Sequence, residues 1–248
     1  MEIKEVREVK EVKGISTRRA HLSFHSFSLP FTPSHSLLII LSLLVFSHTV
    51  RAQWDTSSFS FTSRLNSQYM IPLATGAALG TAGAVLSYVP AVNEWAVALR
   101  DEVVYHDLPR LYIDDYIQYL PALTPVTLNL CGLHSRHKLS KMILLEGGSY
   151  LLGGGWLNAF KYRFGVLRPD ESSYNSFPSG HTFMAFTGAE LLRREYGEEY
   201  PWIAVAGYAV ATLVGCMRVW HNRHWAGDVL AGAGLGIVSV SLVYWVLD

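Results

Sequence analysis

Long apolar stretches separated by short polar segments fill the second half of the chain. A helix needs about 20 apolar residues to cross a bilayer, and most of these stretches reach or approach that length. They cover 113–133, 141–160, 178–192, 201–219 and 225–246. The pattern predicts an all-α, membrane-embedded helical bundle.

A further apolar stretch at 69–89 is rich in Ala and Gly, and its hydrophobicity is modest. It is either a sixth span or a helix that is buried or lies at the membrane interface, so we expect five to six spans in all. The segment after it, 91–105, mixes Trp95 and Leu99 with charged residues such as Arg100. That mixture is typical of an amphipathic helix on the membrane surface.

The first 52 residues follow another pattern. An apolar run at 37–46 is too short to span a bilayer comfortably. Arg18 and Arg19 precede the run, and the small residue Ala52 follows it. These features are typical of a secretory signal peptide, with Gln53 as the expected first mature residue; a short uncleaved anchor is the alternative. The predicted regions are an N-terminal extension with the signal peptide (1–52), an N-terminal helical or interfacial region (53–112) and a helical core (113–248).

The composition agrees with a membrane protein. Hydrophobic residues make up 50% of the chain and charged residues 16%, whereas charged residues are about a quarter of a soluble domain. The formal net charge is zero, which argues against a nucleic-acid partner. Cys131 and Cys216 lie in apolar stretches, and their spacing indicates neither a zinc site nor a redox pair. We expect two buried thiols.

Residues that could bind and attack a phosphate-like anion are concentrated in three clusters. The clusters are Lys161 with Arg168, then Ser179, Gly180 and His181, then Arg218, His224 and Asp228. Lys161 and Arg168 are two helical turns apart if a helix continues to Pro169. Pro178 suits the first turn of a helix, whose backbone amides would stabilise an anion. His224 and Asp228 would share one face of a helix.

The order and spacing of these clusters resemble the signature of the type 2 phosphatidic acid phosphatase superfamily. That signature is Lys-x6-Arg-Pro, then Pro-Ser-Gly-His, then Ser-Arg-x5-His-x3-Asp. The resemblance covers 161–228, and a looser similarity extends from about Asp114 to the end. Met217 departs from it, because the family has Ser there. Either the phosphate shell lacks one donor, or a group such as Asn222 or Arg223 replaces it.

The resemblance implies a role for each matching residue. The phosphate-binding residues would be Lys161, Arg168, Ser179, Gly180 and Arg218. His224 would be the nucleophile that forms a phosphohistidine, Asp228 would orient it, and His181 would be the general acid. We expect no cofactor and no metal, because His221 beside His224 has no third ligand in the pattern.

The resemblance therefore implies a metal-independent phosphatase that removes one phosphate from a membrane lipid. The chain looks most like the lipid A phosphatases of Gram-negative bacteria, and undecaprenyl diphosphate and phosphatidylglycerol phosphate are the alternative substrates. A vanadium haloperoxidase is a second class, which the apolar spans disfavour. A non-catalytic lipid-binding protein is a third, which the two histidines disfavour. The lipid substrate and the membrane are the expected partners, with no protein partner inferred.

The charge pattern predicts how the helices cross the membrane. The basic loop 135–141 should face the cytoplasm, which puts all three clusters on the periplasmic side of the inner membrane. A cleaved signal peptide followed by a spanning 69–89 helix would invert this arrangement. We favour a 69–89 helix that does not span; the alternative is that 37–50 is neither cleaved nor inserted. Glu146 and Glu190 lie within apolar stretches and are either functional carboxylates or satisfied packing residues.

Overall fold

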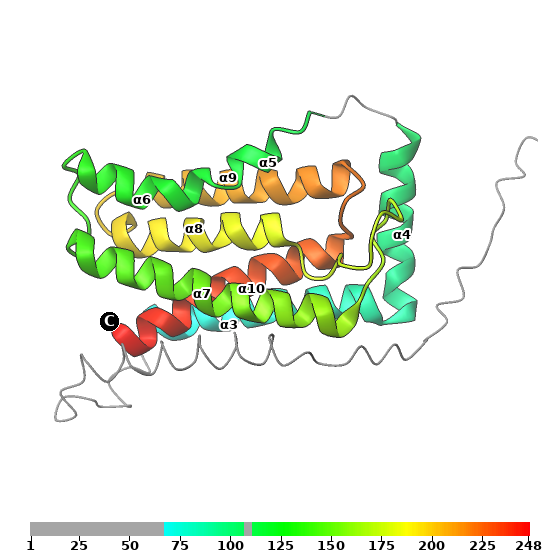
Figure 1. Ribbon diagram of the computed structural model, residues 1–248, viewed down its shortest axis with the longest axis horizontal. Helices are drawn as coiled ribbons and strands as arrows, with labels where there is room; N and C mark the ends of the chain where they lie inside the picture. Colours follow the sequence, from blue (N-terminus) through cyan, green and yellow to red (C-terminus); the bar gives the residue numbers. More distant parts are fainter. Residues whose placement is uncertain (1–66, 107–110) are drawn as a thin grey trace, which may run out of the picture. The chain divides into compact units, whose positions relative to one another are not determined.

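The computed structural model describes residues 67–106 and 111–248, and all regular structure within them is helical (Figure 1). The prediction of an all-α fold is confirmed. The helices are α3 (Ser67–Tyr88), α4 (Pro90–Tyr105), α5 (Asp114–Ile117), α6 (Leu120–Leu130), α7 (Leu139–Phe164), α8 (Gly180–Tyr196), α9 (Pro201–Trp220) and α10 (Ala226–Leu247). The predicted signal peptide and the expected start at Gln53 lie outside the described residues.

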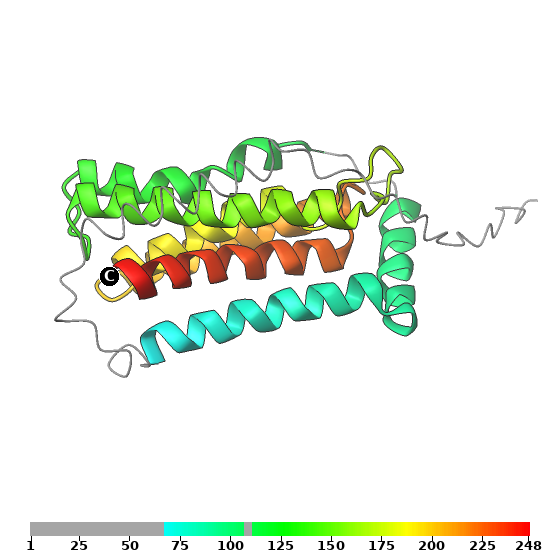
Figure 2. The ribbon, with the colours of Figure 1, turned by 60° about the horizontal axis from the view of Figure 1, so that its bottom comes forward.

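Helix α10 runs beside α3, and small residues allow the two backbones to meet (Figure 2). A Cβ added at Gly83 would lie 2.5 Å from the backbone nitrogen of Ala231 and 2.5 Å from the carbonyl oxygen of Gly227. The hydroxyl of Tyr69, in the first turn of α3, donates to Asp248 at the end of the chain (3.0 Å). The two helices are therefore antiparallel and packed through small residues, as is common in lipid.

The interior of the bundle lies around α8, which contacts α6, α9 and α10. Ala185 and Ala189 of α8 pack with Ala211 and Val214 of α9, and all four side chains are buried. A Cβ at Gly188 would lie 2.5 Å from the backbone of α6. Small residues thus let α8 sit between its neighbours.

Three of the described helices are long and apolar enough to cross a membrane: α3, α9 and α10. Ile71 and Val85 of α3 are exposed, as lipid-facing side chains would be. These facts weigh against our preference for a non-spanning 69–89 helix. The predicted span over 113–133 is divided in the structure into α5 and α6, and the 11 residues of α6 rise only about 16 Å. The number of spans stays a prediction.

The helix ends and loops, which carry most of the polar residues of the three clusters, lie at two opposite ends of the bundle. The C-termini of α7 and α9 and the N-termini of α8 and α10 lie at one end of the bundle, and α4 lies across that end (Figures 1 and 2). The loops 131–138 and 197–200 lie at the other end. The three sequence clusters therefore come together at the end that α4 covers.

The two cysteines differ from the prediction. Cys131 and Cys216 are both exposed, so the expectation of two buried thiols is wrong. Cys131 follows the last turn of α6, and Cys216 lies on α9, a candidate membrane span. An apolar neighbourhood in the sequence of a membrane protein indicates contact with lipid as readily as burial in protein.

Candidate active site

Lys161 and Arg168 come together, although one helix does not carry both. Helix α7 ends at Phe164 because Gly165 adopts a left-handed conformation (φ 53°), which glycine allows at little cost. The condition that one helix carries both residues as far as Pro169 is therefore not met. Lys161 Nζ donates to the carbonyl oxygen of Asn175 (2.6 Å), and Arg168 Nε donates to Asn175 Oδ1 (2.9 Å). Asn175, which no sequence motif marks, accepts from both cations and so holds them side by side.

The electrostatics of this pair favour an anion. Burial and the nearby Arg168 guanidinium lower the pKa of Lys161 to about 8. Burial and Arg218 likewise lower the pKa of Arg168. Positive groups that are desolvated and mutually repulsive gain stability when a negative ligand binds between them.

The Pro-Ser-Gly-His segment begins α8 two residues later than predicted. The helix starts at Gly180 with Ser179 as its N-cap, so Pro178 precedes the cap and does not occupy the first turn. The Ser179 hydroxyl accepts from the amide of Thr182 (3.4 Å) and from its Oγ1 (2.9 Å), and the Ser179 amide donates to the carbonyl of Asp228 (2.9 Å). Ser179 thus holds α8 against α10. The amides of Gly180 and His181 lie in the first turn, where a helix provides no acceptor for them.

His224 and Asp228 meet at the start of α10. His224 precedes the helix, because Trp225 is its N-cap, so the expectation that both residues lie on one helix is wrong. Their side chains are nevertheless close, with His224 Nδ1 3.5 Å from Asp228 Oδ2 and 3.4 Å from Ser176 Oγ. Asp228 Oδ2 accepts from Ser176 Oγ and from the Trp225 amide (3.0 Å). Nδ1 therefore faces the carboxylate, and Nε2 is left as the nitrogen that could attack.

His224 is neutral at physiological pH. Its side chain is 2% exposed, and burial lowers its pKa to about 4 against the opposing effect of Asp228. Lys161 and Arg168 lower this pKa further, because they repel a positively charged ring. An unprotonated imidazole next to two cations has the charge state that a nucleophile for a bound phosphate needs.

Two carboxylates that the sequence analysis missed complete the arrangement. Asp114 is fully buried, and its Oδ2 accepts from Arg218 NH1 (2.6 Å). Asp115 Oδ1 lies 2.8 Å from His181 Nε2 and 3.2 Å from Arg218 NH1. Asp114 Oδ1 is also 3.2 Å from His221 Nδ1, although the geometry is not that of a hydrogen bond. Helix α5 therefore positions both Arg218 and His181.

A signal for these carboxylates was present in the sequence. Asp114 and Asp115 begin the apolar stretch 113–133, and carboxylates in such stretches are functional candidates by default. For Asn175 and Ser176 no comparable signal exists, because they belong to an irregular loop between α7 and α8.

The neighbourhood of Met217 does not supply an evident replacement for the family serine. Met217 is buried on α9. Arg223 NH1 donates to Asp170 Oδ2 (3.0 Å), so that guanidinium is engaged by a carboxylate. Asn222 occupies a left-handed turn position (φ 58°), and its Oδ1 is buried without a hydrogen-bond partner among the described residues.

Glu146 and Glu190, the two carboxylates that lie within apolar stretches of the sequence, have different surroundings. Glu190 lies near the opposite end of α8, where it accepts from Arg193 Nε (2.7 Å), Arg194 Nε (3.0 Å) and Tyr208 (2.5 Å). It is a satisfied structural residue. Glu146 Oε2 is buried without a hydrogen-bond partner in the described part of the chain.

Comparison with known proteins relates this site to a family. Residues 143–248 match the model of the PAP2 superfamily. The chain is 45% identical over 137 residues to a lipid A 1-phosphatase of Porphyromonas gingivalis, an alignment that covers 55% of this chain and 31% of that protein. It is 38% identical over 71 residues to an undecaprenyl-diphosphatase of Sulfolobus acidocaldarius, covering 29% of this chain and 32% of that protein. The chain thus spans about a third of the length of these curated relatives.

A solved structure has the same arrangement of helices. It is a transmembrane PAP2-type phosphatidylglycerolphosphate phosphatase from Bacillus subtilis, with a TM-score of 0.52 and 25% identity. The superposition covers 70% of this chain and 94% of that one. The resemblance found in the three clusters is confirmed, and so is the membrane-embedded helical fold that it implied.

Proposed function

We propose that this chain, whose residues 143–248 match the PAP2 superfamily model, is a membrane phosphatase that removes one phosphate from a lipid, with lipid A as its substrate. One observation carries the proposal. Lys161, Arg168 and Arg218 lie at the same end of the bundle as His181 and His224. Phosphoryl transfer depends on positioning and on stabilising charge over three oxygens, and this end of the bundle offers both.

His224 is the proposed nucleophile. Its Nε2 forms a bond to phosphorus while the bond from phosphorus to the lipid oxygen breaks. Asp228 holds the ring through Nδ1 and stabilises the positive charge that develops on it. Lys161 and Arg168, with the amides of Gly180 and His181, stabilise the phosphoryl oxygens. The product of this step is a phosphohistidine.

His181 is the proposed general acid. Asp115 engages its Nε2, so the proton for the departing lipid oxygen comes from Nδ1, and the carboxylate stabilises the charged ring. Water then attacks phosphorus, the bond from phosphorus to His224 breaks, and His181 accepts the proton of the water. Inorganic phosphate leaves and the starting state is restored.

The choice of substrate rests on similarity and on the position of the site. The alignment with a lipid A 1-phosphatase covers 55% of this chain, and the aligned residues are 45% identical. Helix α4 lies across the active-site end and exposes Trp95 and Tyr105, side chains that suit the membrane interface. Undecaprenyl diphosphate and phosphatidylglycerol phosphate are the alternatives, since relatives of both kinds are similar to the chain.

The periplasmic face is the proposed location of the site. The other end of the bundle has basic residues that the proposed reaction does not use, three of them in or beside the short loop 135–141, and short cytoplasmic loops are rich in Lys and Arg. These residues are Arg136, Lys138, Lys141, Arg193 and Arg194. Because α3 packs antiparallel to α10, Ser67 lies at this basic end of the bundle. If α3 spans the membrane, Ser67 is therefore on the cytoplasmic side. A spanning α3 therefore fits a 37–50 segment that is neither cleaved nor inserted.

The decisive experiment is phosphate release by the purified protein from lipid A, undecaprenyl diphosphate and phosphatidylglycerol phosphate. We expect the highest kcat/KM on lipid A, in the presence of EDTA as in its absence. Equal inactivity on all three lipids, by a protein that is folded in detergent, would overturn the proposal. A bromide oxidation assay with added vanadate tests the haloperoxidase alternative.

The orientation has a separate test. A Ser172→Cys variant should react with an impermeant thiol reagent in intact spheroplasts. Cys131 and Cys216 must first be replaced by Ser, because both are exposed. Labelling that requires lysis would place the site in the cytoplasm.

A further inference from the structure

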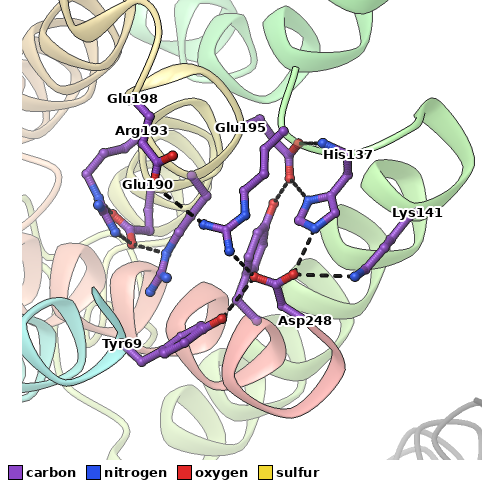
Figure 3. Close-up of polar contacts among 11 residues, drawn as sticks. Tyr69, His137, Lys141, Glu190, Arg193, Glu195, Glu198 and Asp248 are labelled. Carbon is purple, nitrogen blue, oxygen red and sulfur yellow. Dashed lines mark hydrogen bonds and ion pairs between the residues drawn. The ribbon is translucent and has the colours of Figure 1, made fainter. Parts of the chain in front are cut away.

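Figure 3 shows a polar network around Asp248 and Glu195. These residues, at the C-terminal ends of α10 and α8, lie at the end of the bundle opposite the candidate active site. Asp248 accepts from Arg136 NH2 (2.8 Å), from His137 Nε2 (2.8 Å) and from Tyr69 (3.0 Å). Glu195 accepts from the backbone amide of His137 (3.0 Å) and lies 2.9 Å from its Nδ1. This network ties the ends of α3, α8 and α10 to the loop before α7, and the proposed reaction uses none of its residues.

Arg194 is the unusual member of this region. Its side chain is 1% exposed, and its guanidinium lies over the rings of Tyr69 (5.2 Å) and Tyr244 (5.4 Å). Nε donates to Glu190, but NH1 and NH2 have no hydrogen-bond partner among the described residues. Leaving buried, charged donors unsatisfied is costly, and the described residues 67–106 and 111–248 do not complete the surroundings of this side chain.

Arg194 lines a cavity of about 280 Å³. Two further arginines line it, Arg136 and Arg193, and among the described residues Glu198 is its only acidic lining residue. The whole lining consists of Gln68, Arg136, Arg193, Arg194, Gly197, Glu198, Pro201 and Ala204. The Glu198 side chain is mostly exposed, and its Oε1 lies 3.8 Å from Arg136 NH1. The cavity thus has a basic wall and a single exposed acid.

The buried acids nearby bind only some of the guanidinium nitrogens of these three arginines. Glu190 occupies Arg193 Nε and NH2 and Arg194 Nε. Asp248 occupies Arg136 NH2. NH1 and NH2 of Arg194 have no hydrogen-bond partner in the described part of the chain, and a planar guanidinium suits two oxygens of a phosphate.

The position of the cavity indicates where the anion comes from. Pro201 begins α9, a candidate membrane span, and the neighbouring Trp202 is 67% exposed. Trp at the end of a span lies at the depth of the lipid headgroups. Basic pockets between the ends of membrane helices bind anionic headgroups.

We propose that this cavity binds the headgroup phosphate of an anionic phospholipid in the leaflet opposite the active site. Arg194 NH1 and NH2 contact the phosphate oxygens, and Arg136 adds charge at the rim. The site is distinct from the one that hydrolyses substrate, because the two lie at opposite ends of the bundle.

The test is native mass spectrometry of the full chain in neutral detergent, titrated with phosphatidylglycerol or phosphatidylcholine. We expect preferential binding of phosphatidylglycerol. Arg136→Gln should weaken it by up to about tenfold, because one positive charge at the rim of the cavity is lost. Glu198→Lys should strengthen it, and Glu199→Lys, an exposed neighbour that does not line the cavity, should leave it unchanged. Arg136 and Glu198 are partly or largely exposed, so these variants should fold.

Two controls identify the site and the ligand. Lys161→Ala should retain the binding, because Lys161 belongs to the other end. Inorganic phosphate alone, at millimolar concentration, should not displace phosphatidylglycerol. Equal binding of the two lipids, or binding that neither Arg136→Gln nor Glu198→Lys alters, overturns the proposal. So does full displacement by free phosphate, or loss of binding in Lys161→Ala.

Discussion

Asp115 Oδ1 lies 2.8 Å from His181 Nε2, although 66 residues separate the two in the chain. Such a carboxylate fixes which ring nitrogen carries the transferable proton and stabilises the protonated ring. Asp115 also reaches Arg218, so it connects the general acid to a phosphate-binding cation. It is a positioning residue, since we place it in contact with His181 and not with the substrate.

We predict that Asp115→Asn lowers kcat about tenfold to a hundredfold on a lipid substrate with an alkoxide leaving group, because general acid assistance is worth about 10²–10⁴-fold. The loss should be small on p-nitrophenyl phosphate, whose leaving group needs little protonation. The measurement is kcat for both substrates. Asp101→Asn on α4 is the matched control and should change neither. An equal loss on both substrates would indicate a structural role for Asp115.

We predict a bell-shaped dependence of kcat/KM on pH for p-nitrophenyl phosphate, whose leaving group needs little protonation. On a lipid substrate, loss of the proton that His181 must donate adds a second alkaline limb. Burial lowers the pKa of His224 to about 4, so the nucleophile is lost to protonation only below that pH. Burial and Arg168 lower the pKa of Lys161 to about 8, so its charge is lost above that pH and phosphate binding weakens. Since kcat/KM reports the groups of the free enzyme, both limbs should appear in it.

The Lys161→Arg variant tests the alkaline limb. A guanidinium stays protonated, so that limb should move upward or vanish while the acid limb stays near the wild-type position. Comparing the two proteins on one substrate cancels the ionisation of the substrate itself. An alkaline limb that Lys161→Arg leaves in place would assign it to another group, such as His181.

The bundle itself provides a matched pair of glycines. A Cβ at Gly83 meets α10 backbone at 2.5 Å, whereas a Cβ at Gly80, one turn earlier on α3, meets nothing within 4 Å. We predict that Gly83→Val destabilises the protein by about 1–3 kcal/mol, the usual cost of overpacking, and that Gly80→Val changes stability little. Thermal unfolding in detergent measures both. Equal effects would mean that α3 does not pack on α10 as described.

The sequence was sufficient for the residues that carry a motif. Lys161, Arg168, His181, Arg218 and His224 were selected from spacing and resemblance, and the structure brings them to one end. The local geometry was harder to predict. A glycine in a left-handed conformation ends α7 before Arg168, which no helical periodicity reveals.

The residues that the sequence did not reveal act through long-range contacts. Ser176 and Asp228 are 52 positions apart, and Asp114 and Arg218 are 104 positions apart. No spacing rule links such pairs, because their distance depends on how helices pack and not on how far apart they lie in the chain. The division of 113–133 into α5 and α6 was missed for a related reason, since hydropathy does not show where a helix is interrupted.

The last prediction distinguishes the two histidines. His224 carries the phosphoryl group in the proposed mechanism, and His181 only moves a proton. Rapid quenching after mixing with radiolabelled substrate should therefore trap an acid-labile, base-stable phosphoenzyme in the wild type and none in His224→Ala. Because water attack needs His181 to accept a proton, His181→Ala should keep the label, and with a good leaving group the label should decay more slowly than in the wild type.

The choice of substrate makes this comparison informative. With p-nitrophenyl phosphate the first step needs little protonation, so His181→Ala should form the phosphoenzyme at close to the wild-type rate and then lose it slowly. With a lipid substrate the same variant should form it slowly. Asn222→Ala, which leaves both histidines in place, serves as the control for general disturbance of the site. A label that survives in His224→Ala and disappears in His181→Ala would reverse the two assignments, because the nitrogen that holds phosphorus must belong to the residue whose loss removes the label.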